Sequence, residues 1–165
     1  MRCRGCGAAM RLEKGKEYLS CEYCGSIYCP DPNDRGIRVL GEPTGLSCSL
    51  CSLPLTHAAI AGKRMSYCTK CRGILIGMDL FAGLIQTLRA RGSSAVELLQ
   101  PPDWDGLRRK MNCPQCSRPM NTHLYGGPGN IIIDNCEPCS LNWLDDGELQ
   151  RIVGAPDRQF QTREK

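Results

Sequence analysis

The chain has 165 residues, of which 5% are aromatic, and it contains 18 Gly, 11 Pro and 13 Cys, with a formal net charge of +4. This composition excludes one large apolar core and favours several small modules that need additional stabilisation, such as a bound metal ion. The longest apolar run, residues 73–78, is far shorter than the roughly 20 residues of a membrane-spanning helix, so the sequence predicts no transmembrane segment.

Twelve of the thirteen cysteines form six Cys-x-x-Cys pairs, which follow one another as three sets of four. The two pairs of a set are separated by 14, 16 and 19 residues in the first, second and third set, respectively. A hairpin of this length brings two pairs together, so that four thiolates surround one ion in a tetrahedron. The predicted ligands of three structural zinc ions are Cys3, Cys6, Cys21 and Cys24; Cys48, Cys51, Cys68 and Cys71; and Cys113, Cys116, Cys136 and Cys139.

The first module is expected to span residues 1–41. Its predicted strands cover residues 8–13, 17–20, 26–28 and 36–40. Gly7 and Gly25 each follow a cysteine pair directly, where a residue with positive φ closes the metal-binding turn at low cost. Residues 41–45, with two glycines and a proline, are typical of a linker.

The second module is expected to span residues 46–92. Its hairpin strands are predicted near residues 56–60 and 64–67. An amphipathic helix should follow, with Asp79 capping its start and Gly92 ending it. The apolar face of that helix comprises Leu80, Phe81, Leu84, Ile85 and Leu88. Residues 93–111 are interpreted as a short helix beginning at Ser94, followed by a linker.

The third module is expected to span residues 112–154. Its predicted strands cover residues 120–125 and 131–134. Asp145 and Glu148 have the spacing of a capping box, which predicts a helix after the last cysteine. The polar residues 155–165 are expected to form a disordered tail.

The three modules form an irregular internal repeat, in which Leu75-Ile76 aligns with Trp143-Leu144. The predicted fold class is therefore a set of small metal-stabilised, β-rich modules with short helices. Specifically, we expect three tandem four-cysteine zinc ribbons with a helical insertion after the second.

The third module carries a more specific pattern. Its distinctive residues are Cys113-Pro114-x-Cys116, Cys136-x-Pro138-Cys139 and Trp143-Leu144-Asp145-x-Gly147-Glu148-Leu149. In these residues it resembles the transcription-factor-IIB-type zinc-ribbon (zinc-finger) family of small bacterial proteins, although Ser140-Leu141 replaces the glycines that are usual in that family. The second module resembles the family less closely, and the first is similar to zinc ribbons in general. The resemblance implies the ribbon fold and its zinc in three tandem copies.

The ligand set and the charge lead to a prediction of function. Twelve thiolates and three Zn²⁺ ions lower the formal charge by six, to about −2, which favours a protein partner over nucleic acid. Four thiolates leave no open position for water or substrate, and no Ser/His/Asp set or phosphate loop is present in the sequence. We therefore expect a cytoplasmic, non-enzymatic adaptor or regulatory protein. The alternatives are a rubredoxin-like iron protein that transfers electrons, and a zinc or thiol redox sensor.

Several other residues were weighed as functional candidates. Cys29 is interpreted as a small buried residue, or else as a spare ligand or redox-responsive thiol. His57 and His123 are expected to be surface or packing residues, with a metal-ligand role as the alternative. Trp143 is expected to pack over the third metal site, with an exposed partner-binding role as the alternative. Basic side chains that could contact phosphates, or simply be solvated, are Arg11, Lys14, Lys16, Arg108, Arg109 and Lys110. The helix that begins at Asp79 is expected to be core, with a docking surface as the alternative.

Overall fold

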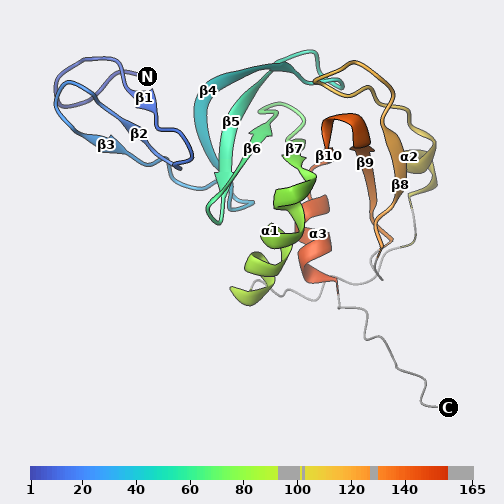
Figure 1. Ribbon diagram of the computed structural model, residues 1–165. Coiled ribbons are helices and arrows are strands. Elements are labelled where there is room, and N and C mark those ends of the chain that lie inside the picture. Colours follow the sequence, from blue (N-terminus) through green and yellow to red (C-terminus); the bar gives the residue numbers. More distant parts are fainter. Residues whose placement is uncertain (93–100, 102, 127–129, 156–165) are drawn as a thin grey trace.

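The three cysteine modules are distributed over two β-sheets (Figure 1). The computed structural model describes residues 1–92, 101, 103–126 and 130–155. Within these residues, module 1 forms a small antiparallel sheet from β1 (Arg11–Leu12), β2 (Leu19–Ser20) and β3 (Ile27–Tyr28). Modules 2 and 3 share one larger sheet of seven strands.

The larger sheet has the order β4-β5-β6-β7-β10-β9-β8, with all neighbours antiparallel. Its strands are β4 (Arg38–Ser47), β5 (Pro54–Ile60), β6 (Lys63–Tyr67), β7 (Ile74–Gly77), β8 (Asn121–Leu124), β9 (Ile132–Cys136) and β10 (Leu141–Leu144). The helices are α1 (Met78–Ala90), α2 (Trp104–Arg108) and α3 (Glu148–Gly154), with a single 3-10 turn at Glu137–Cys139.

The predicted hairpins are present in all three modules. In module 2 the chain reverses through Ala61 and Gly62, which have φ values of 50° and 81°. Two successive residues with positive φ are what a two-residue β-hairpin turn requires, because that backbone twist matches the twist of the flanking strands. In module 1, Gly15 at φ 74° reverses the chain between β1 and β2 as predicted.

Modules 2 and 3 meet at β7 and β10, which pair along their outer edges. Trp143 lies opposite Leu75, and each is the fourth residue after the last cysteine of its own module. Since the strands are antiparallel and share this central pair, the two modules are related by an approximate twofold axis. The sequence repeat is therefore also a spatial repeat.

Helices α1 and α3 follow β7 and β10, and they lie side by side over one face of the sheet (Figure 1). Phe81 and Leu84 of α1 and Leu149 of α3 belong to one buried apolar cluster with side chains from both modules. Arg89 of α1 donates hydrogen bonds to the carbonyl oxygens of the last turn of α3, at 2.9 Å from Ile152. This side chain satisfies carbonyl groups that a helix end leaves without partners.

The other face of the large sheet carries a second buried cluster, which contains Cys48 and Cys68 of module 2 and Cys113 and Cys136 of module 3 together with Trp143. Module 1 has a small cluster of its own, formed by Cys3, Met10, Leu19 and Cys21. Modules 2 and 3 consequently share both of their cores. The strand predicted at residues 36–40 of module 1 is part of β4 in the large sheet, and Ile37 joins the first cluster, whereas residues 1–36 contribute to neither.

Residues 41–45, which were expected to form a linker, lie instead within β4. This strand is at the edge of the sheet, and its pairing with β5 shifts register on both sides of Pro43. Gly41 and Gly45 have φ values of 80° and 81°. An edge strand with irregular pairing tolerates a proline and positive-φ glycines that a central strand would not.

Helix α1 ends near Gly92 as predicted, but it begins at Met78 with Gly77 as its N-cap. Asp79 therefore lies in the first turn, where its charge complements the helix dipole, and it is not the cap. Helix α2 was not predicted; Asp103 caps it by accepting from the backbone N–H groups of Asp105 and Gly106.

Two expectations concern residues outside the described ranges, namely the short helix beginning at Ser94 and the tail of residues 155–165, of which only residue 155 is described. Among the described residues, no helix is both long and apolar enough to cross a membrane.

Candidate metal centres

The structure brings the twelve paired cysteines together into the three predicted sets of four. In each set the four Sγ atoms lie within 4.8 Å of one another. Sγ–Sγ distances within the sets are 3.5 Å for Cys3–Cys24, 3.4 Å for Cys6–Cys21, 3.6 Å for Cys48–Cys71 and 3.6 Å for Cys116–Cys136. A tetrahedral zinc ion with Zn–S bonds of about 2.3 Å would place its sulfurs about 3.8 Å apart. The three sets therefore fit one tetrahedral four-thiolate metal ion each.

Disulfide bonding does not account for these distances, because a disulfide joins its sulfurs at about 2.05 Å. All thirteen cysteines lie in the described part of the chain, and all are free. The chemistry of four converging thiols suits zinc, and it also suits iron.

Each Cys-x-x-Cys pair sits in the same tight turn. The residue after each pair has positive φ: Gly7 (76°), Gly25 (72°), Ser52 (57°), Arg72 (62°), Ser117 (59°) and Ser140 (52°). In five of the six turns, the backbone N–H of this residue donates to the carbonyl of the first cysteine, at 2.8–2.9 Å. The expectation for Gly7 and Gly25 is confirmed. The four non-glycine residues adopt a conformation that costs about 1–2 kcal/mol per residue. Because modules 2 and 3 have no glycine at these positions, glycine predicted the turn only in module 1.

The first cysteine of each pair is buried, and the second is partly or fully exposed. Sites 2 and 3 have two buried and two half-buried sulfurs, whereas Cys6 and Cys24 of site 1 are exposed. Site 1 is thus the one that solvent, chelators and oxidants reach most easily.

The thiols of a set share their protons unequally. The backbone N–H and then the guanidinium of Arg118 lower the pKa of Cys116 to about 6. The hydrogen bond to Cys116, followed by burial, raises the pKa of Cys139 to about 12. A metal ion bound by four thiolates must displace the remaining protons, so its affinity should rise with pH.

Trp143 lies between sites 2 and 3. Its side chain is 0% exposed and belongs to the cluster that contains cysteines of both modules. A Cβ atom added to Gly73, two residues after Cys71, would lie 2.1 Å from the indole ring. Trp143 therefore packs against the second cysteine set as well as its own, and its burial excludes a role as an exposed anchor for a partner.

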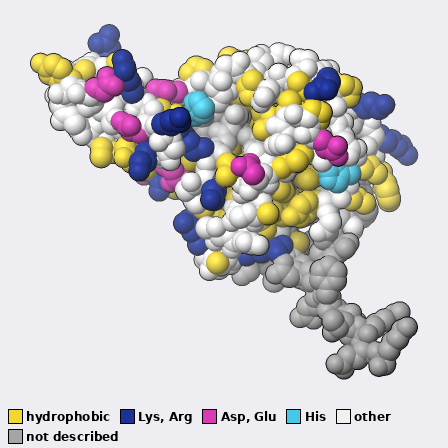
Figure 2. Space-filling model, viewed as in Figure 1, with side chains coloured by type: hydrophobic (Ala, Val, Ile, Leu, Met, Phe, Trp, Pro, Cys, Tyr) yellow, Lys and Arg dark blue, Asp and Glu magenta, His cyan; other side chains and the backbone are white. Residues whose placement is uncertain are grey.

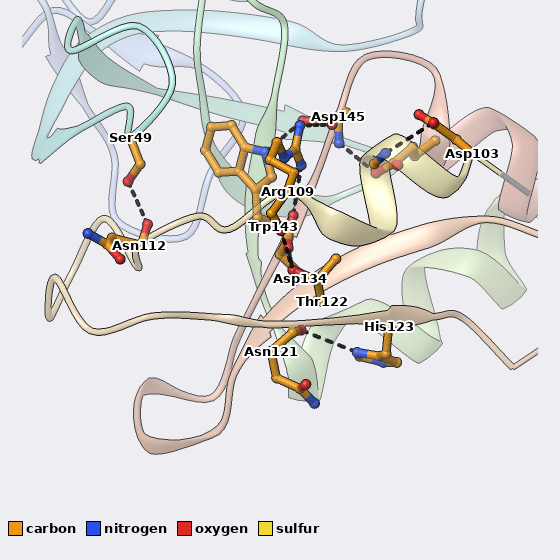
Figure 3. A network of polar contacts seen from close by, with 12 residues as sticks. Ser49, Asp103, Arg109, Asn112, Asn121, Thr122, His123, Asp134, Trp143 and Asp145 are labelled. Carbon is orange, nitrogen blue, oxygen red and sulfur yellow. Dashed lines mark hydrogen bonds and ion pairs between the residues drawn. The ribbon is translucent and has the colours of Figure 1, made fainter.

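A partly buried polar network lies beside site 3 (Figure 3). Arg109 contacts Asp134 at 2.8 Å and Asp145 at 2.6 Å, and Thr122 donates a hydrogen bond to Asp134. Asp145 also accepts a hydrogen bond from the indole N–H of Trp143 at 3.0 Å. Because Asp134 is only 1% exposed, its charge depends on Arg109 for compensation.

This network changes the interpretation of Arg109, whose guanidinium is committed to two carboxylates instead of phosphates or solvent. This role of Arg109 was not predicted from the sequence. The sequence does contain one indication of such a network. Asp134 is a single carboxylate at the end of the apolar run Ile131-Ile132-Ile133, where a buried charge would need a cationic partner.

The remaining candidates lie outside the metal sets. Cys29 is exposed, so the expectation of a small buried residue is wrong. Burial was expected because free cysteines are usually buried. Cys29 instead follows β3, a two-residue edge strand that no helix covers among the described residues. His57 is half-buried, with burial as the main cause of its lowered pKa, and Nδ1 of His123 lies 3.3 Å from the carbonyl oxygen of Asn121. Neither histidine belongs to a group of converging metal ligands.

Comparison with known protein families, with curated proteins and with solved structures found no match for this chain.

Proposed function

We propose that the protein binds three structural zinc ions and acts in the cytoplasm as a non-enzymatic adaptor or regulatory protein that docks another macromolecule. The observation that carries the proposal is the convergence of twelve thiols into three groups of four, each within 4.8 Å. Four protein thiolates complete a tetrahedral coordination shell, so the ions would stabilise the fold and leave no position for a substrate. The resemblance of module 3 to transcription-factor-IIB-type zinc ribbons supports this assignment.

Metal analysis of the purified protein tests the zinc assignment. We expect about three zinc ions per chain and a colourless protein, because Zn²⁺ has a filled d shell. A red protein containing iron would instead support the rubredoxin-like electron carrier. A native protein with neither metal would overturn the proposal.

The environment of Arg109 favours a protein partner over nucleic acid. Its guanidinium is held by Asp134 and Asp145 and is not free for phosphates, whereas the exposed pair of Arg11 and Glu22 at 2.9 Å is weak. An affinity pull-down from the source cell, with and without nuclease, tests this part on protein of known metal content. Captured partners should survive nuclease treatment; their loss on digestion would favour nucleic acid instead.

The exposure of site 1 supports a second candidate function, that of a zinc or thiol redox sensor. Cys6 and Cys24 of this site are exposed, and so is Cys29, the thirteenth thiol. Accessible thiolates are oxidised before buried ones. A sensor would release about one zinc ion under mild oxidant while keeping the other two; simultaneous release of all three, or of none, would contradict it.

A further inference from the structure

The third strand of module 1, β3, has an unpaired outer edge in the described part of the chain. In modules 2 and 3, the outer edge of the equivalent strand is paired. In every module, the residue two positions before the third cysteine pairs with the residue four positions after the fourth cysteine. These pairs are Leu19 with Tyr28, Ser66 with Leu75, and Asp134 with Trp143. The identical register makes β3, β7 and β10 equivalent strands.

Strands β7 and β10 cover each other. Around the central pair of Leu75 and Trp143, Ile76 lies opposite Asn142 and Ile74 opposite Leu144. In modules 2 and 3, the strand that follows the fourth cysteine therefore pairs, antiparallel, with the equivalent strand of the other module. Strand β3, in contrast, is the last strand of its sheet in the described part of the chain. It lies along the outer border of module 1, away from the large sheet (Figure 1).

Side-chain exposure follows the same division. Ile27 of β3 is 63% exposed, whereas its equivalents Ile74 and Asn142 are 3% and 6% exposed. Met1 is 66% exposed, whereas Met111, which also stands two residues before its module's first cysteine, is 2% exposed. Hydrophobic side chains are accordingly visible among the charged ones on the module 1 end of the molecule (Figure 2).

A cavity of about 170 Å³ adjoins this edge and is lined by residues that include Met1, Met10, Ile27 and Tyr28. In modules 2 and 3, the equivalents of Met1, Met10 and Tyr28 pack into the cluster around Trp143, which both modules fill together. The equivalents of Ile27 are buried outside that cluster. Module 1 therefore resembles module 2 or module 3 alone, without the second module that pairs with its edge strand and completes its apolar cluster.

We infer that β3 is a self-association edge, at which two copies of this chain pair β3 antiparallel around a twofold axis. Tyr28 would lie opposite Tyr28 of the partner subunit, and Ile27 opposite Cys29 of the partner subunit, as in the β7–β10 pair. A second copy is favoured as the occupant because the same edge is closed by its structural equivalent within the chain, and because a twofold pairing of equal register closes on itself and leaves neither β3 edge unpaired.

The composition of the edge supports this inference. Residues 26–30 (Ser-Ile-Tyr-Cys-Pro) contain no charge. Edges are protected by charges, by proline or by shortness; β3 is short and Pro30 limits how far pairing can extend, but no charge would repel across a twofold axis. Module 1 has no helix equivalent to α1 or α3 among the described residues, so the buried area is small. The dimer should therefore be weak and concentration-dependent.

Sedimentation velocity of the full-length, metal-loaded protein over a range of concentrations provides the first test. We expect a shift from monomer towards dimer as concentration rises, and its loss in Ile27→Lys. The matched control is Leu124→Lys, because Leu124 is 42% exposed on β8, an edge strand of the other sheet. A wild-type protein that stays monomeric at millimolar concentration, or equal effects of the two substitutions, would overturn the inference. Unchanged metal content in both variants separates loss of the dimer from loss of the fold.

A second test examines the register. In Ile27→Cys, the new thiol would face Cys29 of the partner subunit, so mild oxidation should give a covalent dimer. The double variant Ile27→Cys/Cys29→Ser should not form it, and neither should Leu124→Cys. Equal cross-linking in all three variants would show random collision and contradict the proposed pairing.

Discussion

At the scale of single residues, the contact between Gly73 and Trp143 fixes how closely modules 2 and 3 approach. A Cβ at position 73 would lie 2.1 Å from the indole ring, which is buried and cannot move aside without displacing both modules. We predict that Gly73→Ala lowers the free energy of unfolding by about 2–3 kcal/mol or more, as overpacking does in a close-packed core. Thermal unfolding at fixed free zinc would measure the loss.

Gly83→Ala is the matched control for this substitution. Gly83 lies within α1, and a Cβ there would have no heavy atom within 4 Å outside the helix's own backbone. Alanine favours a helix interior over glycine by up to about 1 kcal/mol, so this variant should be slightly stabilised. Equal destabilisation by both substitutions would show that the contact with Trp143 is not the cause.

Arg109 tests the cost of leaving a buried carboxylate without its partner. Arg109→Met removes the cation that contacts Asp134, and an uncompensated buried charge costs about 3–5 kcal/mol. Arg11→Met is the control, because the side chains of Arg11 and Glu22 are 71% and 62% exposed. An exposed pair of this kind contributes about 1 kcal/mol or less.

Chemical denaturation of the metal-loaded variants distinguishes these two arginines. The double variant Arg109→Met/Asp134→Asn should recover part of the loss, because it removes the stranded charge together with its partner. If Arg109→Met and Arg11→Met cost the same, the network beside site 3 is not a buried ion pair in solution.

At the scale of elements, the start of α3 combines a backbone cap with a buried carboxyl. Glu148 accepts a hydrogen bond from the N–H of Asp145 at 2.7 Å, which is one half of the predicted capping box. The other half is absent, because both carboxylate oxygens of Asp145 are bound, one by Trp143 and the other by Arg109. The helix accordingly begins at Glu148 behind a positive-φ Gly147.

The environment of Glu148 predicts a pH dependence of stability. Burial raises the pKa of this carboxyl to about 8, although the N–H of Asp145 opposes the shift. With its folded pKa above its unfolded one, Glu148 holds more protons in the folded state between about pH 4.5 and 8, so its contribution to stability falls as pH rises through that window. Glu148→Gln keeps an acceptor for Asp145 and removes the charge.

This variant should therefore be more stable than the wild type at pH 8.5, on the order of 1–3 kcal/mol, with a smaller difference at pH 6. Unfolding should be followed only above pH 6, because acid protonates the metal-binding thiols as well. A difference that does not change between the two pH values would contradict a raised pKa.

The elements that the sequence predicted are those with local signals. The cysteine sets, the hairpins and the end of α1 follow from spacing, turn residues and helical periodicity within one module. Strands β7 and β10 were not predicted, because each is a four-residue run just after a cysteine pair whose partner lies in the other module. The contact of Trp143 with Gly73 and the role of Arg109 depend on this same long-range pairing.

At the scale of the whole molecule, the three modules should behave as two folding units. Modules 2 and 3 share one sheet and two buried clusters, which Ile37 and β4 also join, whereas residues 1–36 of module 1 have their own sheet and their own cluster. Module 1 contacts the β5–β6 hairpin through polar groups, such as Glu17, which accepts from the N–H of Gly62 at 2.6 Å. Loss of one metal site should therefore have different consequences in the two units.

Removing half of a cysteine set tests this division. Cys3→Ser/Cys6→Ser should abolish site 1 and leave about two metal ions per chain, with modules 2 and 3 folded. Cys113→Ser/Cys116→Ser should abolish site 3 and also weaken site 2, because the cluster around Trp143 is shared. We expect about one metal ion per chain in that variant.

Metal content and tryptophan fluorescence together give the readout. Trp104 is 59% exposed and would mask the signal, so both variants should be made in a Trp104→Phe background that leaves Trp143, which is 0% exposed. The emission of Trp143 should shift to longer wavelength in the site 3 variant and stay unchanged in the site 1 variant, since only the former exposes its ring to water. Two metal ions retained in the site 3 variant, with unshifted emission, would show that modules 2 and 3 fold independently despite their shared sheet.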